Sequence, residues 1–149
     1  MISKACQYAI RAVIFLASKA DDKIKLNVKQ IAKEIDAPEA FTAKTLQLLN
    51  KHKIITSLKG PYGGFFIEDY QMDTPIIDIV NAIDGLQIFT ACGLGLKQCF
   101  AAHPCAFHDI YTVLRNSLQK AFEKTTIRKL AKKIENGTHF LSGIQTKKK

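Results

Sequence analysis

The chain has 149 residues, of which 47% are hydrophobic, and it carries a formal net charge of +9. This length has room for one domain with an accessory helix, and the hydrophobic content excludes an intrinsically disordered chain. The charge is uneven, because residues 1–60 hold 11 Lys and Arg against 5 Asp and Glu. A basic N-terminal third indicates a polyanionic partner, most commonly DNA, although a solubilising lysine surface would have the same composition.

Residues 9–20 are apolar enough to suggest a signal peptide or a membrane span. Arg11 interrupts this run, however, and the apolar residues follow a helical spacing instead of forming a solid block. We therefore expect no secretion signal, no membrane partner and a cytoplasmic location. In that reducing compartment, clustered cysteines are more often metal ligands than disulfides.

Three helices are expected before residue 52. The first covers residues 3–20, where apolar side chains recur at intervals of three and four. Asn27 and Gln30 form a capping-box pattern that opens a short second helix, whose expected buried residues are Val28, Ile31 and Ile35. Pro38 starts a third helix that runs to about Lys51, with the expected buried residues Phe41, Thr45, Leu48 and Leu49.

A β-hairpin follows, with strands over residues 54–58 and 65–67 and a glycine-containing turn over residues 59–64. Two short helices joined by a short turn are typical of a helix-turn-helix, and equally of an ordinary helical hairpin. The hairpin with its basic tip favours the first interpretation, because helix, helix and β-hairpin together make a winged helix.

The candidate DNA contacts lie on the second and third helices and in the hairpin. Thr42 and Gln47 could hydrogen-bond to base edges, and Ala43 could meet a thymine methyl group. Lysine side chains would neutralise phosphates, and two glycines would let the wing approach the duplex closely. The complete set is Lys29, Thr42, Ala43, Lys44, Gln47, Lys59, Tyr62, Gly63 and Gly64.

In the second half, a helix over residues 76–83, closed by Gly85, leads to a strand-like segment over residues 86–90. A long helix is expected from His103–Pro104, and a final helix from residue 127 to about 136. The long helix carries an apolar stripe of Ile110, Val113, Leu114, Leu118, Ala121 and Phe122. Such a stripe is either domain core or a dimer seam, and we favour the seam.

Between these helices, three cysteines and a histidine lie within seventeen residues, namely Cys92, Cys99, Cys105 and His108. Soft thiolates on one short loop are natural ligands of an iron–sulfur cluster or a thiophilic metal. The gaps of six and five residues are wider than the knuckles of most structural zinc sites. Small buried cysteines, a redox disulfide and a zinc site remain alternatives. His108 follows Cys105 at helical spacing, so it is the candidate fourth ligand, with an exposed cap residue as the alternative.

The expected fold class is mainly α with a small β-hairpin, a winged helix-turn-helix followed by a long dimerisation helix. Residues 1–85 would form the DNA-binding domain and residues 86–108 the cysteine cluster-binding loop. Residues 109–136 would form the dimerisation helix and the C-terminal helix, and residues 137–149 a flexible basic tail.

Several short motifs of this chain occur together in one known family. They are Tyr8–Ala12, Gln30–Ala32, Leu49–Ile55, Ser57–Phe65, Val80–Gly85, the three loop cysteines and Thr125–Ile127. As a set they resemble the Rrf-two family of bacterial winged-helix regulators, which includes IscR, NsrR and CymR. The resemblance covers roughly residues 1–134. The chain departs from the family at the wing tip, where Lys59 stands in place of a usual arginine, and in the first cysteine gap, which is one residue longer.

The resemblance implies a homodimer that binds an imperfect palindrome in double-stranded DNA. It also implies a [2Fe–2S] or [4Fe–4S] cluster on the three-cysteine loop, and in some members the fourth ligand comes from near the position of Cys6 in the partner subunit. The function expected is therefore a transcriptional regulator that senses redox state, iron or nitric oxide and has no catalytic residues. One alternative is a cluster-free regulator that works through thiol oxidation or a partner protein. A thiol oxidoreductase is less favoured, because the chain has no C-x-x-C and no βαβ pattern.

Overall fold

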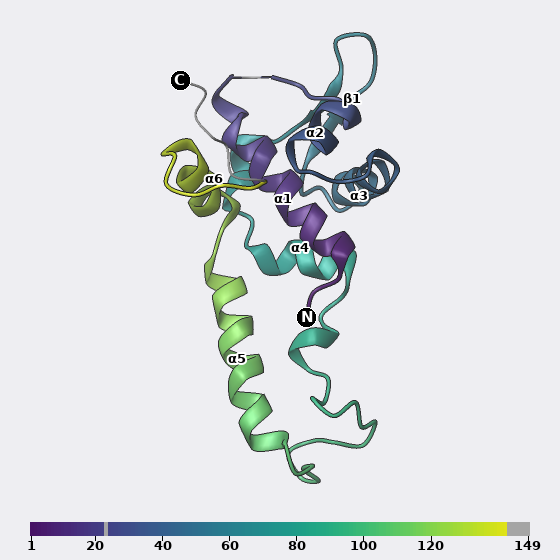
Figure 1. The fold of residues 1–149 in the computed structure, drawn as a ribbon, viewed down its shortest axis with the longest axis vertical. Helices are drawn as coiled ribbons and strands as arrows, with labels where there is room; N and C mark the ends of the chain where they lie inside the picture. Colours follow the sequence, from purple (N-terminus) through teal and green to yellow (C-terminus); the bar gives the residue numbers. More distant parts are fainter. Residues whose placement is uncertain (23, 143–149) are drawn as a thin grey trace.

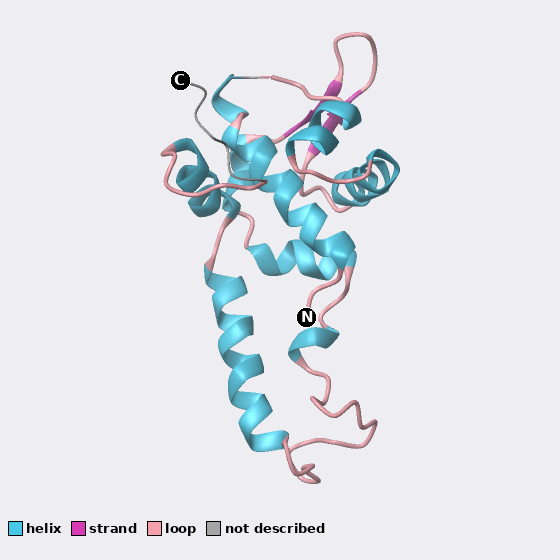
Figure 2. Ribbon diagram, in the orientation of Figure 1, coloured by secondary structure: helices cyan, strands magenta, loops and turns pink. Residues whose placement is uncertain are grey.

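The computed structural model describes residues 1–22 and 24–142. In this part the chain is mainly helical with one small β-hairpin, as the sequence predicts (Figure 2). The α-helices are α1 (Lys4–Ser18), α2 (Val28–Glu34), α3 (Glu39–Lys51), α4 (Ile76–Ile83), α5 (His108–Lys124) and α6 (Ile127–Glu135). The strands are β1 (Thr56–Leu58) and β2 (Gly64–Phe66), and the short 3-10 helices are η1 (Ala20–Asp22), η2 (Asp69–Asp73) and η3 (Gln87–Phe89).

Helix α1 runs through the centre of the folded body. Ser3 caps its start, because its hydroxyl accepts a hydrogen bond from the Cys6 N–H at 3.0 Å. The apolar residues spaced by three and four along α1 are buried, among them Ala9, Ala12, Val13 and Leu16. They pack against α3, α4 and α6, so that α1 connects the early helices to α6 (Figure 1).

Helices α2 and α3 form the helix-turn-helix pair. The predicted capping box is present, because Asn27 and Gln30 each accept a backbone hydrogen bond from the other through their side chains. The turn after α2 takes Asp36 to a φ of 53°. Arg11 of α1 donates to the Ile35 carbonyl at 2.7 Å, which satisfies a backbone group that the end of α2 leaves open. Pro38 is the N-cap of α3 and not its first residue.

The buried face of α3 is displaced from the prediction. Thr45 and Leu49 are buried as expected, but Phe41 and Leu48 are 48% and 40% exposed, and Leu46 takes their place in the core. Where apolar residues are adjacent in the sequence, the helical period does not decide which side of the helix is buried. The packing of α1 and α2 against α3 decides which of them is buried.

The hairpin is shorter than predicted. Strands β1 and β2 pair antiparallel, with Thr56 opposite Phe66. Ile54 and Ile55 lie in the hydrophobic core and precede the strand. The reason is local, because Lys53 adopts a positive φ of 60° and turns the chain inward at the end of α3.

Two expected elements in the cysteine region are wrong. Residues 86–90 do not form a strand but contain η3, which brings the ring of Phe89 to 5.7 Å from that of Phe122. The long helix begins at His108 and not at His103–Pro104. A backbone bridge between Phe100 and His103 holds this stretch as a loop, and a proline disfavours helical backbone in the residue before it.

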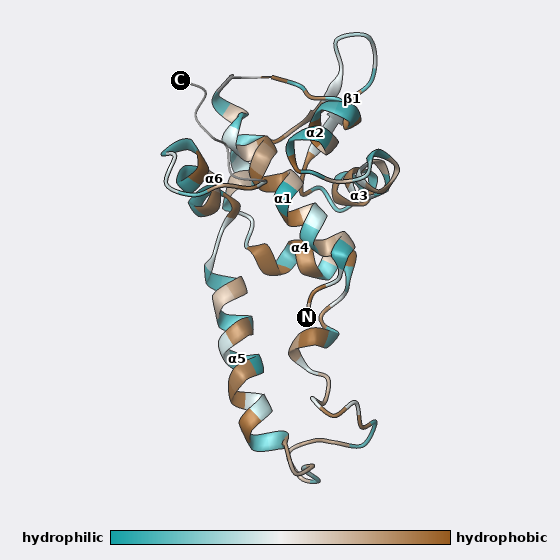
Figure 3. Ribbon diagram, in the orientation of Figure 1, coloured by the Kyte–Doolittle hydropathy of each residue, from teal (hydrophilic) through white to brown (hydrophobic). Residues whose placement is uncertain are grey.

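Helix α5 leaves the folded body, and the cysteine loop lies at its far end, so that both form a projection (Figure 1). At the root of this projection, Phe122 packs on a small cluster of Cys6, Val80 and Phe89. Apolar residues continue along α5 (Figure 3). Its outward side is uncovered in the single chain, because Ile110, Val113 and Leu114 are between 58% and 65% exposed.

The predicted flexible tail is described only to residue 142. Just after α6, the chain folds back on that helix, since the His139 N–H donates to the Lys133 carbonyl at 3.3 Å. The remainder of the predicted tail, residues 143–149, lies outside the described residues. Among the helices that the structure does describe, we find none with the length and apolar character needed to cross a membrane.

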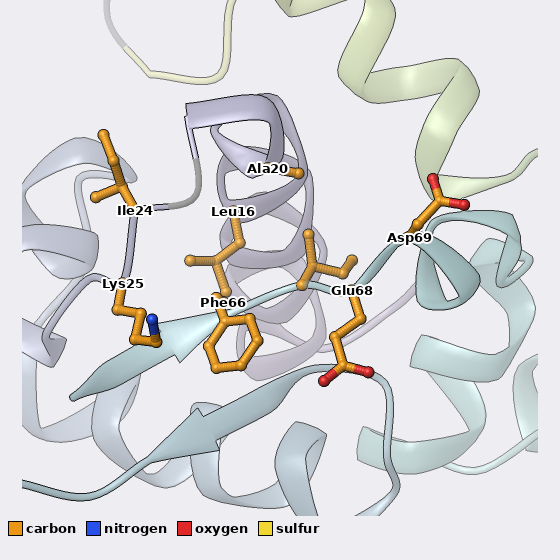
Figure 4. A pocket seen from close by; sticks show the side chains of 8 residues that line it. Leu16, Ala20, Ile24, Lys25, Phe66, Glu68 and Asp69 are labelled. Atoms are coloured by element: carbon orange, nitrogen blue, oxygen red, sulfur yellow. The ribbon is translucent and has the colours of Figure 1, made fainter.

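A hollow of about 300 Å³ lies between the end of α1, the segment before α2 and the return strand β2 (Figure 4). Its wall is formed by Leu16, Ala20, Ile24, Lys25, Phe66, Ile67, Glu68 and Asp69. None of these is a predicted site residue. The hollow lies in the folded body, away from the cysteine loop (Figure 1), so it belongs to neither of the sites described next.

Candidate functional site

The exposed side of α3 carries three of the predicted DNA contacts. Lys44 and Gln47 are exposed, and Ala43 is partly exposed. Phe41 and Leu48, which the sequence analysis placed in the core, border them on the surface. This side of α3 therefore offers a cation, an amide and apolar groups, which are the chemical types that contact phosphates, base edges and thymine methyl groups.

Thr42 does not belong to that surface. Its side chain is 1% exposed, and its hydroxyl donates to the Pro38 carbonyl at 2.9 Å, one helical turn earlier. A threonine inside a helix commonly bonds back to the preceding turn in this way. The prediction that Thr42 contacts a base edge is therefore wrong.

The tip of the hairpin carries Lys59 and Tyr62, and the tyrosine is 90% exposed. Gly63 and Gly64 are partly buried, and packing within the protein explains both. A Cβ on Gly64, whose φ is +147°, would lie 2.8 Å from the Leu26 carbonyl oxygen, and a Cβ on Gly63 would collide with the carbonyl of Leu58. The two glycines are thus needed to build the wing, whether or not it approaches DNA.

Lys29, the last of the predicted DNA contacts, is exposed near the start of α2. Helices α2 and α3 and the hairpin lie on the same side of the body, away from the projection that α5 makes (Figure 1). Apart from Thr42, the predicted contact residues therefore lie on neighbouring elements and are at least partly accessible.

The loop cysteines meet at the far end of the projection. Cys92 Sγ lies 3.6 Å from Cys105 Sγ, and the sulfur atoms of Cys92, Cys99 and Cys105 are all within 4.8 Å of one another. Cys99 Sγ lies 3.3 Å from Nδ1 of His108. All four side chains are partly exposed. The structure thus brings the four predicted ligands into one group.

The surroundings of the thiols alter their acidity. The backbone N–H groups of Leu96 and Leu94, together with the neighbouring thiols, lower the pKa of Cys92 to about 7. For Cys99, the N–H of Cys105 favours the thiolate, but desolvation and the other two thiols together raise its pKa. Because the thiolate is the form that binds a metal, Cys92 is suited to bind a cation near neutral pH.

The donor atoms fit a soft metal or an iron–sulfur cluster. Three thiols and one imidazole supply the ligand types of iron–sulfur centres, and the same combination also occurs in structural zinc sites. Cys105 precedes α5, so a shared helix face does not align it with His108 as predicted. A hydrogen bond from the His108 N–H to the Cys105 carbonyl at 3.0 Å aligns them instead.

Arg115 of α5 is a part of this region that the sequence analysis missed. It donates to the carbonyls of Ala91 at 2.6 Å and Thr90 at 3.0 Å, immediately before Cys92. A signal was present in the sequence, because Arg115 stands seven residues after His108 and so shares its side of a helix. Its partners are backbone groups of a loop, however, and no residue pattern reveals them.

Comparison with known proteins decides the family. The model of the Rrf2 family, described as an iron-dependent transcriptional regulator, matches residues 2–133. The chain belongs to the Rrf2 family. This is the family that the sequence motifs resemble, and the match spans both the helix-turn-helix and the cysteine loop.

Relatives of this Rrf2 protein are found in several bacteria. An HTH-type transcriptional regulator of Aquifex aeolicus is 33% identical over 132 residues, which are 87% of this chain and 90% of the relative. The HTH-type transcriptional regulator NsrR of Geobacillus kaustophilus is 29% identical over 119 residues, which are 78% of this chain and 75% of the relative.

Two solved structures share the fold. CymR, the global cysteine regulator of B. subtilis, superposes with a TM-score of 0.73 at 22% identity, covering 89% of this chain and 96% of CymR. IscR of T. potens gives a TM-score of 0.71 at 19% identity, covering 96% of this chain and 93% of IscR. The predicted winged helix-turn-helix fold is thereby confirmed.

Membership of the Rrf2 family gives this chain its general function. It is a DNA-binding transcriptional regulator and not an enzyme, as predicted. Its three clustered cysteines are able to bind a metal or a cluster.

Proposed function

We propose that this Rrf2 protein is a homodimeric, cytoplasmic regulator that senses redox state, iron or nitric oxide through an iron–sulfur cluster on Cys92, Cys99, Cys105 and His108. The convergence of these donors carries the proposal, since the three sulfur atoms lie within 4.8 Å of one another and His108 Nδ1 is 3.3 Å from one of them. The description of the family as iron-dependent favours iron over zinc.

The cluster would be [2Fe–2S] or [4Fe–4S], and when bound it supplies a redox-active group that oxidants and nitric oxide attack. Cys92, Cys99 and Cys105 would hold it as thiolates, and His108 would bind through a ring nitrogen. The partial exposure of all four side chains leaves the site open to small reactive molecules.

For DNA, the exposed side of α3 would enter the major groove while the hairpin reaches the backbone or the minor groove beside it. Gln47 and Ala43 would contact base edges, and Lys29, Lys44 and Lys59 would neutralise phosphates. Tyr62 at the tip and the backbone of Gly63 and Gly64 complete the contact set. All of these residues are at least partly accessible in the structure.

The dimer would form along α5, whose apolar outward side is otherwise left in water. Two-fold symmetry would place two copies of α3 at a fixed spacing, which matches a palindromic operator. The cysteine loop is attached to the same helix through Arg115. Gain or loss of the cluster can then change the population of dimers whose spacing fits DNA.

The proposal is tested on protein purified without oxygen. Iron and sulfide analysis and visible absorbance should reveal a cluster, and replacement of Cys92, Cys99 or Cys105 by alanine should abolish both the absorbance and the cluster-dependent change in operator affinity. His108→Ala should leave a labile cluster, because water can fill the fourth position.

Cys6→Ala is the matched control, since it removes a cysteine that lies outside the loop. It should retain the cluster. If Cys6→Ala or Gln7→Ala loses the cluster while His108→Ala keeps it unchanged, the fourth ligand comes from the partner subunit. Zinc without iron in the anaerobic protein would overturn the proposal.

One distance favours a second candidate function, a thiol switch without a cluster. Cys92 Sγ and Cys105 Sγ are 3.6 Å apart, so a small movement would allow a disulfide of about 2 Å to form. Anaerobic protein that is free of iron and loses operator binding when peroxide joins these two cysteines would support this candidate. Retention of iron at both cysteines would exclude it.

A further inference from the structure

Arg115 fastens the loop to α5 at the residues that precede Cys92. One nitrogen of its guanidinium, Nη1, donates to the Ala91 carbonyl at 2.6 Å and to the Thr90 carbonyl at 3.0 Å. The other, Nη2, lies 3.4 Å from the hydroxyl of Thr112 on α5. These bonds tie the backbone just before Cys92 to α5.

Tyr111 fixes the loop on the other side of Cys92. A Cβ on Gly93 would lie 2.7 Å from Cγ of the Tyr111 ring, so the ring occupies the space that any larger residue would need. The Arg115 guanidinium carbon in turn lies 5.7 Å from the centre of the same ring. The residues on both sides of Cys92 are therefore held by two adjacent side chains of α5.

The position of the Arg115 side chain favours the loop geometry over the stability of the fold. Nε of Arg115 is buried and has no hydrogen-bond partner among the described residues. A buried donor without a partner lowers the stability of the fold. An arginine placed only to stabilise α5 would gain more by turning its guanidinium to solvent or to an acidic residue.

The same side of α5 carries a predicted ligand. His108, Tyr111 and Arg115 follow one another at intervals of three and four residues, so they lie along one face of the helix. His108 is next to Cys99, whereas Arg115 controls the segment that carries Cys92. One helix face thus contacts both Cys99 and the backbone just before Cys92.

We propose that Arg115 is a positioning residue of the cysteine site, which holds the backbone before Cys92 to α5 and so presets Cys92 against Cys105 and His108. This inference rests on the proposed metal or cluster site. It assigns to Arg115 a role in that site without contact with the bound group. Groups that orient a metal ligand typically change metal affinity by about 10- to 100-fold when they are removed, and we expect Arg115→Gln to fall in this range.

The test compares Arg115→Gln, Arg115→Lys and the control Lys120→Gln, which changes an exposed charge on the same helix. The first measurement is amide hydrogen exchange over residues 90–96 in anaerobic, metal-free protein. Arg115→Gln should speed exchange there and leave α1 and α3 unchanged. The second measurement is a Co²⁺ titration followed by thiolate-to-cobalt absorbance, in which Arg115→Gln should weaken binding by about 10- to 100-fold.

Arg115→Lys retains the charge and one donor group, so it should restore part of the Co²⁺ affinity. Faster exchange throughout Arg115→Gln would mean a general loss of structure and would overturn the inference. The inference would also be overturned if both Arg115 variants showed the same hydrogen exchange over residues 90–96 and the same Co²⁺ affinity as Lys120→Gln. If the unaltered protein binds neither Co²⁺ nor iron, the proposed function is wrong, and the inference about Arg115 is wrong with it. Binding by the unaltered protein with no effect of Arg115→Gln removes the inference alone.

Discussion

The four cysteines of this protein lie in two different environments. Cys6 is 0% exposed in the small cluster that anchors α5, and burial together with the nearby Asp84 carboxylate raises its pKa to about 12. The three loop cysteines are partly exposed. Position in the fold, and not residue type, therefore decides which thiols are available for chemistry.

We predict that Cys6 resists alkylation in the native, metal-free protein at pH 8.5, whereas the loop thiols react. A buried thiol with a raised pKa stays protonated, and the thiolate is the reactive form. Folding raises this pKa above its ordinary value of 9.0. The free energy of unfolding therefore keeps the full contribution of Cys6 below pH 9 and loses it as the pH rises toward 12. Mass spectrometry after iodoacetamide treatment should find three modified cysteines, and four once the protein is unfolded. Modification of Cys6 at the rate of the loop thiols would contradict this prediction.

At the scale of elements, the helix-turn-helix and the hairpin would have different roles in the proposed contact with DNA. Helix α3 presents Lys44 and Gln47 on a rigid scaffold, while the hairpin tip presents Lys59 and Tyr62 on a turn built around glycines. A lysine at a hairpin tip contacts phosphate without regard to sequence, whereas a glutamine on α3 is able to distinguish bases. Substitutions in the two elements should therefore have different signatures.

We predict that Lys59→Ala weakens binding to all duplexes alike and lowers the salt slope by about one unit, as loss of one phosphate contact does. Gln47→Ala should instead reduce the preference for the operator over other sequences. The measurement is fluorescence anisotropy with a labelled duplex at several salt concentrations. Lys132→Ala on α6 is the control, because it removes an exposed lysine far from α3 and the hairpin (Figure 1). An unchanged affinity of Lys59→Ala would remove the wing from the contact set.

For the whole molecule, the decisive feature is the uncovered side of α5. Three large apolar side chains, Ile110, Val113 and Leu114, stand in water in the single chain. The folded body does not cover them, because α5 extends beyond it (Figure 3). A second copy of the chain would bury this side, and the proposed dimer follows from that need.

We predict that Leu114→Asp dissociates the dimer while each chain stays folded. Burying a charge against an apolar seam costs about 3 kcal/mol or more, on the order of a 100-fold weaker dimer. Because Leu114 is 58% exposed in the single chain, its replacement leaves the protomer core intact. Analytical ultracentrifugation measures the change, and Asn116→Asp adds the same charge at an exposed position off the seam. A dimer that survives Leu114→Asp would place the interface elsewhere.

The sequence by itself determined the order of the α-helices and the hairpin, and the residue types of the candidate site. Apolar spacing, the Asn27–Gln30 capping box and the glycine-containing turn act over a few residues, so they predict helices, turn and hairpin without knowledge of the rest. The three cysteines were likewise evident from their clustering within one loop, with His108 shortly after them. Local physical chemistry carries this information, and distant parts of the chain do not alter it.

Only the tertiary structure decided which residues face solvent and what holds the loop. Thr42 and Phe41 exchanged their expected places, because the packing of α1 and α2, and not the helical period alone, selects the buried side of α3. Helix α5 starts later than predicted, since the loop before it is closed by its own backbone bonds. Arg115 was missed because its partners are carbonyls that every residue possesses. A contact between a side chain and a distant backbone group cannot be predicted from residue types, because every residue has a backbone carbonyl. Such partners are identified only once the chain is folded.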